Sequence, residues 1–465
     1  MASRERILFV TGRLAERSLR RVLESLGPQV GFDYEVSVLG ISVAALMHPD
    51  WVANKLTIDE NFDRVVLPGW CGGNLDRLSQ QFGLPFEAGP QDLFDLPEHF
   101  GRAAREEADL SQYDIEILAE INHAPRLSDV EIVQQADAYR QSGADLVDLG
   151  CVPGETWSRC GDVTRLLRRE GFRVSIDSFD RVEVETTVEA GAELVLSCNG
   201  ANIDWTADLD AELVVIPDTP SDFDSLERSV AQLRERNVRF RVDPVLEPIG
   251  FGFAASLARY FEVRRRWPDA EMLMGIGNLT ELTEVDSAGI NVLLAGICQE
   301  LGIRSVLTTE VINWSRTAVR EFDLARRLVQ HAVSQNTLPK HVDSNLVMLR
   351  DAKVRELGED ELQELASRLK DPNFRIFVER GELHLMNRDG YWRGDDPYVL
   401  FEQAVAESAG VDSAHAFYLG YELCKATTAL TLGKQYRQDE ALQWGFLTVP
   451  EVSIHERRRG TKEDE

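Results

Sequence analysis

Polar side chains follow several apolar segments in the middle of the chain. Asn122 and Asp177 come directly after two of these segments, and Asp243 and Asn278 follow two others. A single Asn or Asp after a strand is usually a helix cap or a turn former. Four of them on one rim predict a shared pocket of carboxylates and amides. Such a pocket suits a heterocycle with adjacent N–H donors and a carbonyl, and it also permits proton transfer.

Two further residues belong to the same predicted rim. His123 follows Asn122, and its ring is a general base or a hydrogen-bonding bystander. Asn199 follows the fourth apolar segment. The sequence contains no phosphate-binding loop and no H-E-x-x-H motif, so neither a phosphate cradle nor a catalytic zinc is predicted.

Eight apolar segments of strand length alternate with helical patterns between residues 113 and 335. Eight strand–helix units in about 220 residues match a (β/α)8 barrel, or TIM barrel, in which chemistry is carried at the carboxyl ends of the strands. An open, doubly wound sheet is the alternative, which the count of eight disfavours. The segments are Ile115–Ile121, Asp145–Leu149, Phe172–Ile176, Glu193–Ser197, Glu212–Ile216, Val238–Val242, Glu271–Met274 and Ile303–Leu307.

Several helix starts are visible in the same region. Ser128 and Glu131 form the pattern of a capping box, and Ser221 and Asp286 are expected to cap two other helices. The gap after the fourth segment is short, so its helix must be short.

Two smaller domains are predicted on either side of the barrel. Residues 1–110 alternate strand and helix patterns as in a small α/β layer domain. Their glycine turns, Thr11-Gly12 and residues 68–73, either bind an anion or make tight turns with positive φ. Residues 339–447 contain a strand–turn–strand pattern (374–378 and 383–386) and helical patterns (397–406 and 413–432), which indicates a compact α+β domain. Residues 103–109 are predicted to be helical or linking, and 448–465 to be a charged, disordered tail.

Composition excludes several classes of function. The 465 residues carry 50 Lys plus Arg against 79 Asp plus Glu, a formal charge of −29. This charge repels nucleic acids and anionic membranes. The longest uncharged stretch, 36–49, is too short to span a bilayer, and the first residues do not resemble a signal peptide. The six scattered cysteines, Cys151 and Cys160 included, are expected to be reduced thiols in a cytoplasmic protein.

The middle of the chain resembles the pterin-binding barrel family, which includes dihydropteroate synthase and the tetrahydropterin-dependent methyltransferases. The resemblance covers residues 116–329, and the three-part layout is similar to dihydropteroate synthase-like proteins of organisms that use tetrahydromethanopterin. In those proteins a Rossmann-like part precedes the barrel and a small domain follows it. The segments that carry the resemblance are Glu120-Ile121-Asn122, residues 142–150, residues 174–178, residues 189–192, Asp243-Pro244 and, for the last domain, residues 421–445.

The resemblance implies roles for the rim residues. Asp177, Asn199, Asp243 and Asn278 would bind a reduced pterin of the tetrahydrofolate or tetrahydromethanopterin type, and Asn122 and His123 would be catalytic. Asn122 lies where the synthase binds its metal and pyrophosphate, which makes Mg²⁺ a candidate. The chain departs from the synthase at Leu196, which replaces an asparagine, and at residues 275–278 and 308–310, where basic residues are missing.

Three functions therefore stay open. The first is a transferase in the biosynthesis of a folate-like or tetrahydromethanopterin-like one-carbon carrier. The second is methyl transfer from a tetrahydropterin to a thiol or to a corrinoid protein, which Asn278 supports. The third is a non-catalytic pterin carrier or scaffold. The oligomeric state also stays open, with a homodimer as one candidate.

Overall fold

The computed structural model describes residues 4–71, 74–102, 108–408 and 411–451. The chain divides into two compact units, residues 1–114 with 326–342, and residues 115–325 with 343–465. The predicted domain boundaries stay predictions. Residues 103–107 and 452–465 lie outside the described residues, and with them most of the predicted linker and of the predicted tail.

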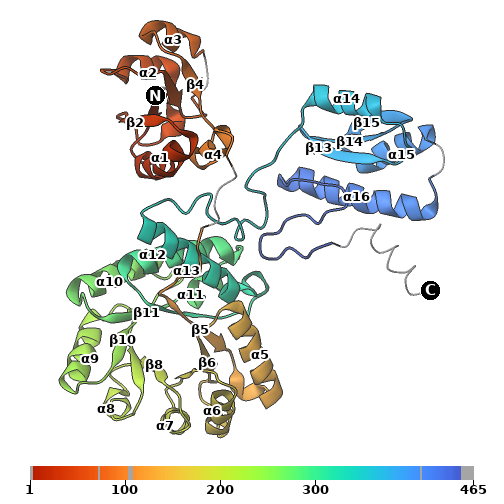
Figure 1. Ribbon diagram of the computed structural model, residues 1–465. Coiled ribbons are helices and arrows are strands. Elements are labelled where there is room, and N and C mark those ends of the chain that lie inside the picture. The colour runs from red at the N-terminus through yellow and green to blue at the C-terminus, as the bar shows by residue number, and fades with distance from the viewer. Residues whose placement is uncertain (1–3, 72–73, 103–107, 409–410, 452–465) are drawn as a thin grey trace. The chain divides into compact units, whose positions relative to one another are not determined.

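Eight parallel strands close into a barrel (Figure 1) in the order β10-β11-β12-β5-β6-β7-β8-β9. Each of the eight apolar segments of the sequence forms one strand, which confirms the predicted TIM barrel. The strands are β5 (Glu116–Ile121), β6 (Leu146–Gly150), β7 (Val174–Asp177), β8 (Leu194–Cys198), β9 (Glu212–Val215), β10 (Phe240–Val242), β11 (Glu271–Gly275) and β12 (Ser305–Thr308).

Helices connect the strands and surround the barrel (Figure 1). The helix after β8 has only four residues, as expected from the short gap. The helices of the barrel are η3 (Ala124–Arg126), α5 (Asp129–Ser142), α6 (Cys160–Arg169), α7 (Arg181–Glu189), α8 (Ile203–Thr206), α9 (Phe223–Glu235), α10 (Phe253–Arg266), α11 (Gly277–Thr280), α12 (Ser287–Leu301), η4 (Asn313–Ser315) and α13 (Ala318–Gln335).

One of the three predicted caps forms as expected. Ser128 and Glu131 make the capping box of α5, each accepting from the other's backbone N–H. The prediction for Ser221 is wrong, because Asp222 caps α9 by accepting from the Ser225 N–H. Asp286 stands at the N-cap of α12, but within the described residues its side chain makes no capping hydrogen bond. Asp222 therefore caps α9 in place of Ser221, and Asp286 occupies the N-cap position of α12 without a side-chain cap.

The barrel interior is layered because alternate strand residues point inward. Its middle is an apolar layer of Leu118, Leu146, Leu194, Leu196, Val214 and Leu273. At the amino ends of the strands, Glu116 forms ion pairs with Arg173 and with Arg241, the latter at 2.6 Å. At the carboxyl ends, polar residues take the inward positions.

The first unit contains a four-stranded parallel sheet in the order β2-β1-β3-β4. This order matches the predicted Rossmann-like α/β layer domain. Its elements are β1 (Arg6–Thr11), α1 (Glu16–Val30), β2 (Asp33–Val38), η1 (Ala44–Leu46), α2 (Pro49–Lys55), β3 (Arg64–Leu67), α3 (Asp76–Phe82), β4 (Phe86–Ala88), η2 (Leu93–Asp95) and α4 (Leu96–His99).

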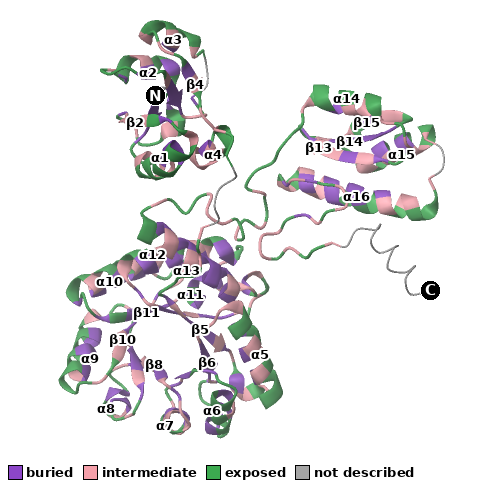
Figure 2. Cartoon of the chain, viewed as in Figure 1, coloured by how far each residue is buried: buried purple, intermediate pink, exposed green. Residues whose placement is uncertain are grey.

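Both faces of this sheet are buried (Figure 2), so the unit has three layers. Ile7 and Phe9 of β1 pack with α1, while Leu8 and Val10 pack on the opposite face with residues of α2 and α3. The predicted positive φ of the glycine turns is wrong for Gly12 and Gly69, whose backbones lie outside the left-handed region. These two glycines are needed because other backbone segments approach them closely. Residues 72–73 lie outside the described residues.

The C-terminal part forms an antiparallel three-stranded sheet, β13-β14-β15, as in the predicted α+β domain. The predicted strand–turn–strand becomes β13 and β14, whereas β15 was not predicted because its five residues begin and end with glycine. The elements are α14 (Glu359–Arg368), β13 (Arg375–Glu379), β14 (Glu382–Asn387), β15 (Gly390–Gly394), α15 (Pro397–Glu407) and α16 (Ser413–Leu432).

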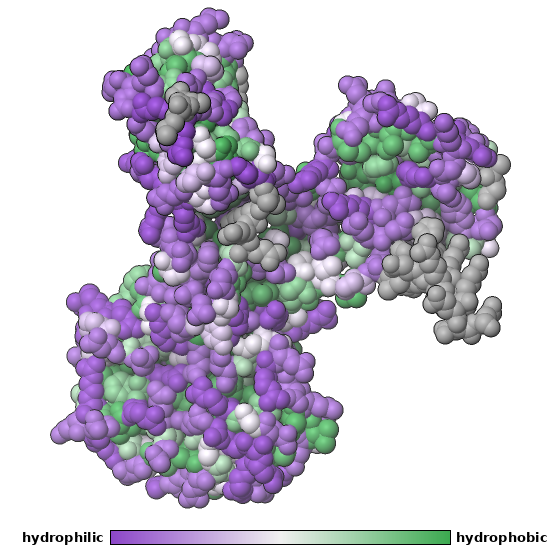
Figure 3. Space-filling model, in the orientation of Figure 1, coloured by the Kyte–Doolittle hydropathy of each residue, from purple (hydrophilic) through white to green (hydrophobic). Residues whose placement is uncertain are grey.

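Hydrophilic residues cover most of the surface visible in Figure 3, as the high content of charged residues predicts. Within the described ranges, no helix combines the length and the apolar character needed to cross a membrane.

Candidate functional site at the barrel mouth

A cavity of about 360 Å³ lies at the carboxyl ends of the barrel strands. Four of the six residues predicted for the site line it, and each comes from a different strand end: Asn122, Asp177, Asp243 and Asn278. The other lining residues are Glu120, Leu196, Ser197, Val214, Ile216, Val245, Leu273, Gly275, Gly277, Glu281, Leu307 and Thr309.

Asp243 is held firmly by one of its two carboxylate oxygens. Oδ1 accepts a hydrogen bond from the hydroxyl of Tyr260 at 2.6 Å and another from the Val245 N–H at 2.8 Å. Tyr260 lies on α10 and is fully buried. Oδ2 faces the cavity, 3.9 Å from the place where a Cβ on Gly275 would be.

Asp177 is held in a similar way at the end of β7. Its Oδ1 accepts from the Ser197 hydroxyl at 2.6 Å. Ser197 has φ of 62°, and Val245 has φ of 65°, which is a costly backbone conformation for a β-branched residue. Both strained residues line the cavity, and strain of this kind gathers at ligand sites.

Two asparagines complete the polar lining. The Nδ2 of Asn278 donates to the Leu246 carbonyl at 2.9 Å, which orients its Oδ1 as a free acceptor. The Nδ2 of Asn122 lies 3.4 Å from Glu120 Oε1, and its buried Oδ1 has no hydrogen-bond partner among the described residues. A buried acceptor without a partner is costly, so a ligand N–H is its natural complement.

Glu120 lines the cavity and Asp148 is its buried neighbour on the next strand; neither was predicted for the site. Glu120 of β5 is paired in register with Asp148 of β6, which in turn is paired with Ser175 of β7. The Ser175 hydroxyl donates to Asp148 Oδ1 at 2.5 Å, while the buried Asp148 Oδ2 has no partner among the described residues. Glu120 lies two positions before Asn122 and therefore points to the same face of the strand, which was the signal available in the sequence.

Burial perturbs the acids of the mouth. Desolvation, with the charges of Asp177 and Glu281, raises the pKa of Glu120 to about 7. Desolvation raises the pKa of Asp243 to about 6, against the hydrogen bond from Tyr260. It also raises the pKa of Asp177, and that of Asp148 well above its usual range. The site can therefore both accept hydrogen bonds and exchange protons near neutral pH.

The segments after β11 and β12 each add one more acid. Glu281 lines the cavity, and its Oε1 accepts from the Thr309 hydroxyl at 3.0 Å. Glu310 accepts from the Val319 N–H at 3.0 Å, and burial raises its pKa to about 7. Among the described lining residues none is Lys, Arg or His. The mouth is thus acidic and contains no cation of its own there.

The structure does not bring His123 and Asn199 to this cavity. His123 is exposed, and its left-handed backbone (φ 51°) turns the chain out of β5 into η3. The side chain of Asn199 accepts from the Ala201 N–H at 3.0 Å in a local turn before α8. A local hydrogen bond of this kind competes with a ligand for Asn199. The roles predicted for His123 and Asn199 stay predictions.

A metal site is not preformed at the mouth. In the described part of the chain, no group of three or more His, Cys, Asp or Glu side chains is arranged to hold a metal ion. The Mg²⁺ suggested by the resemblance stays a prediction.

Two segments of the chain match protein-family models. Residues 5–91 match DUF6513, a family of unknown function, and residues 368–439 match PterinBD-DUF4346. An uncharacterized protein of Methanocaldococcus jannaschii is 26% identical over an alignment that covers 93% of this chain and 98% of that protein.

Solved structures of dihydropteroate synthase are similar to about half of the chain. The enzyme of Yersinia pestis with a pterin–sulfa conjugate is 16% identical (TM-score 0.38) and covers 49% of this chain and 96% of its own. The enzyme of Burkholderia cenocepacia with 7,8-dihydropteroate is 21% identical (TM-score 0.37) and covers 48% of this chain and 93% of its own. The PterinBD-DUF4346 match lies in the C-terminal part of the chain, outside the barrel, and agrees with the resemblance drawn from the sequence for that part.

Proposed function

We propose that the barrel mouth binds the head group of a reduced pterin. The observation that supports this most is that four predicted polar residues, from four strand ends, line one cavity of about 360 Å³. That volume lies in the usual range for a small-molecule site. The match of residues 368–439 to a family named for pterin binding supports the same ligand class.

The proposed binding mode follows from the free atoms of the site. A pterin presents an amino-pyrimidinone edge with adjacent N–H donors, and an ionised carboxylate accepts two such bonds. Asp243 offers Oδ2, because Oδ1 is already held by Tyr260 and Val245. Asp177 is held by Ser197 and offers its other oxygen in the same manner. The unpartnered Oδ1 of Asn122 is a third acceptor.

We infer a transferase that acts on this pterin in the biosynthesis of a folate- or tetrahydromethanopterin-type carrier. Glu120, with a pKa of about 7, is the group best suited to exchange a proton with the bound ring. The acidic lining favours a neutral or protonated ring over a diphosphate, whose departure requires a nearby cation. A diphosphate leaving group would need cations from outside this cavity.

Methyl transfer is a second candidate, and Asn278 favours it. Because its Nδ2 is bonded to Leu246, its Oδ1 is left to accept from a protonated ring nitrogen without adding charge. This chemistry needs no cation at the mouth. The acceptor would be a thiol or a corrinoid protein supplied by a partner.

Binding can be tested by titration calorimetry with 6-hydroxymethyl-7,8-dihydropterin and with tetrahydrofolate. Asp243→Asn places an amide N–H opposite the N–H donors of the ring, and Asp177→Asn does the same on the other side. Each should weaken binding by about 100-fold. Asp269→Asn, an exposed carboxylate before β11, is the matched control and should bind normally. If both site variants bind as well as wild type, the proposed pocket is wrong.

The reaction can be tested separately on the wild-type chain. Diphosphate release from a dihydropterin diphosphate with an arylamine supports the biosynthetic reaction, whereas loss of the methyl group from a 5-methyl-tetrahydropterin with a thiol or corrinoid acceptor supports methyl transfer. Pterin binding without either reaction would overturn both enzyme proposals and favour a carrier.

A further inference from the structure

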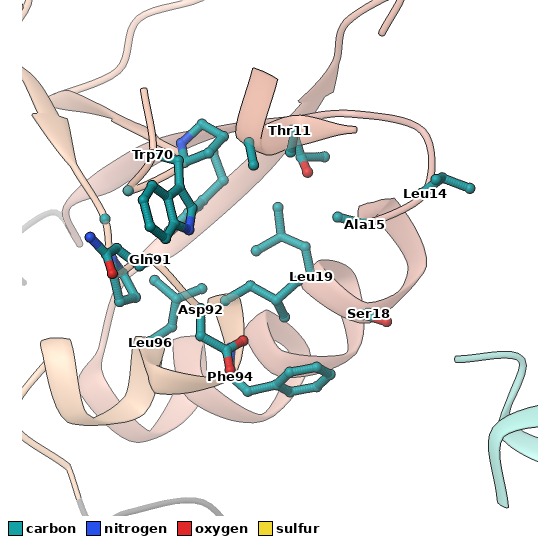
Figure 4. Close-up of a pocket in the computed structure, with 18 of the residues that line it drawn as sticks. Thr11, Leu14, Ala15, Ser18, Leu19, Trp70, Gln91, Asp92, Phe94 and Leu96 are labelled. Carbon is teal, nitrogen blue, oxygen red and sulfur yellow. The ribbon is translucent and has the colours of Figure 1, made fainter. Parts of the chain in front are cut away.

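We propose that the first unit carries a second ligand site, which binds a planar aromatic ring bearing an anionic group. A cavity of about 260 Å³ lies among the loops that follow β1, β3 and β4 (Figure 4). All of its lining residues belong to this unit. The site is independent of the pterin proposal.

The cavity is at the position where parallel sheets of this kind bind ligands. In the order β2-β1-β3-β4, the chain leaves β1 towards one edge and later returns to its other side as β3. The loops after β1 and β3 therefore diverge and leave a crevice between them at their carboxyl ends.

Two pairs of loops form a rigid frame around this crevice. On one side, the Arg13 and Leu14 N–H groups donate to the carbonyls of Ile41 and Ser42. On the other, the Gly69 N–H donates to the Pro90 carbonyl at 3.2 Å. A Cβ on Gly69 would lie 2.5 Å from the Gln91 nitrogen, so the approach requires glycine. The turns at Gly12 and Gly69 thus bring backbone segments together around a cavity, a role that was not predicted from the sequence.

The inside of the frame is mainly apolar. Leu19 of α1, Val66 of β3 and Leu96 of α4 are buried along its walls. The indole of Trp70 lies across the cavity from the α1 residues Ser18 and Leu19 (Figure 4). Trp70 is 58% exposed, which is unusual for so large an apolar side chain beside a cavity. A flat ring that stacks on this indole would bury both surfaces.

The polar groups of the site set the charge of its ligand. Residues 337–341 line the cavity and are tied at two points, by Thr337 to Ser18 at 3.2 Å and by His341 to Asp92 at 3.1 Å. The Asp92 carboxylate is thereby compensated. Lys340 is exposed and, among the described residues, pairs with no carboxylate. In a chain of charge −29, an uncompensated cation beside an apolar slot favours an anionic substituent on the ring.

The test uses the full chain and 2-naphthoate as the probe, with titration calorimetry as the readout. Cyclohexanecarboxylate keeps the charge without the ring, and 2-naphthamide keeps the ring without the charge. We expect 2-naphthoate to bind more tightly than either. Trp70→Ala should weaken its binding by about tenfold or more, and Lys340→Gln by about threefold.

Matched controls remove equivalent groups elsewhere. Phe417→Ala removes an aromatic ring that is 77% exposed on α16, and Lys55→Gln removes an exposed cation at the end of α2. Both should leave binding unchanged. Ala15→Phe fills the cavity from the start of α1, where the helical backbone tolerates Phe, and tests the site if Trp70→Ala does not fold.

Several results would overturn the proposal. Equal binding of cyclohexanecarboxylate would show that no ring is recognised, and normal binding by Ala15→Phe would show that the probe does not enter this cavity. Binding that survives Trp70→Ala but is lost in Asp243→Asn would assign the probe to the barrel mouth.

Discussion

The barrel mouth and the cavity of the first unit both form at the carboxyl ends of parallel strands, yet their lining side chains differ in polarity. The mouth is lined by Glu120, Asp177, Asp243 and Glu281, whereas the first unit offers apolar walls, Trp70 and one compensated acid, Asp92. The same edge of a parallel sheet can therefore be specialised for N–H donors or for an aromatic face.

The two sites also use glycine differently, and this shows where each is rigid. At the mouth, Gly150 makes room for the carboxylate of Glu120, a side chain that can move. In the first unit, Gly69 makes room for the backbone of residues 89–91, which cannot. At the mouth, the burial of charged groups costs free energy. In the first unit, the constraint is the close packing of backbone segments.

The largest expected effect is that of Gly69→Ala on stability. Its Cβ would overlap the Pro90–Gln91 backbone, so the first unit should lose about 2 to 4 kcal/mol of its free energy of unfolding. Hydrogen exchange of the β1 amides measures this loss. Gly40→Ala, which has open space around it in the same unit, is the control and should be neutral. A neutral Gly69→Ala would show that the frame is not rigid.

At the mouth, Glu120→Gln is expected to raise the free energy of unfolding, whereas Gly69→Ala lowers it. The folded pKa of Glu120, about 7, lies above its ordinary value of 4.5, so the native state holds more protons between these values. Its free energy of unfolding therefore falls as pH rises from about 4.5 to 7, and the penalty is complete above 7. Glu120→Gln removes the penalty and should stabilise the barrel by about 1 to 3 kcal/mol at pH 8.

Denaturant unfolding at pH 8 and at pH 4 tests this sign. The gain should disappear at pH 4, where the wild-type carboxyl is protonated in both states. Glu300→Gln, on the exposed face of α12, should change neither value. A loss of stability at pH 8 would mean that the charge of Glu120 is compensated in the free protein.

A smaller loss is expected for Asp92→Asn in the first unit. This change removes the ion pair with His341 but keeps the oxygen that accepts from the Phe94 N–H, so about 1 kcal/mol should be lost. Hydrogen exchange of α1, next to the tied residue Ser18, provides the measurement. If Asp92→Asn instead stabilised the first unit, as Glu120→Gln is expected to stabilise the barrel, the acids of the two sites would not differ in their effect on stability.

The smallest effect is a shift in pH dependence. Pterin binding should strengthen as pH rises through about 6, because Asp243 then becomes ionised. Tyr260→Phe removes a hydrogen bond that favours the ionised form, and should move this midpoint upward. Calorimetric affinity between pH 5 and 8 measures the midpoint, and the pH dependence of 2-naphthoate binding should stay unchanged. An unshifted pterin midpoint would assign the titration to another acid.

Much of the fold could be predicted because strand and helix patterns are local. Eight apolar segments, each followed by a helical pattern, were enough for the closed barrel, and the alternating strand and helix patterns of residues 1–110 were enough for a small α/β layer domain. Strand β15 was missed because its short, glycine-bounded sequence has no apolar pattern of its own. Ser221 was misassigned because two neighbouring residues could serve equally as a cap.

The sequence by itself determined that Asn122, Asp177, Asp243 and Asn278 follow strands, and strands of one barrel end on one rim. Only the tertiary structure decided which rim residues face the cavity, since Asn199 satisfies a local turn and His123 is exposed. In the closed barrel, the pairing of β5 with β6 also placed Glu120 beside Asp148, because register between strands sets which inward residues become neighbours. Burial, which raises the pKa of these acids, exists only after that closure.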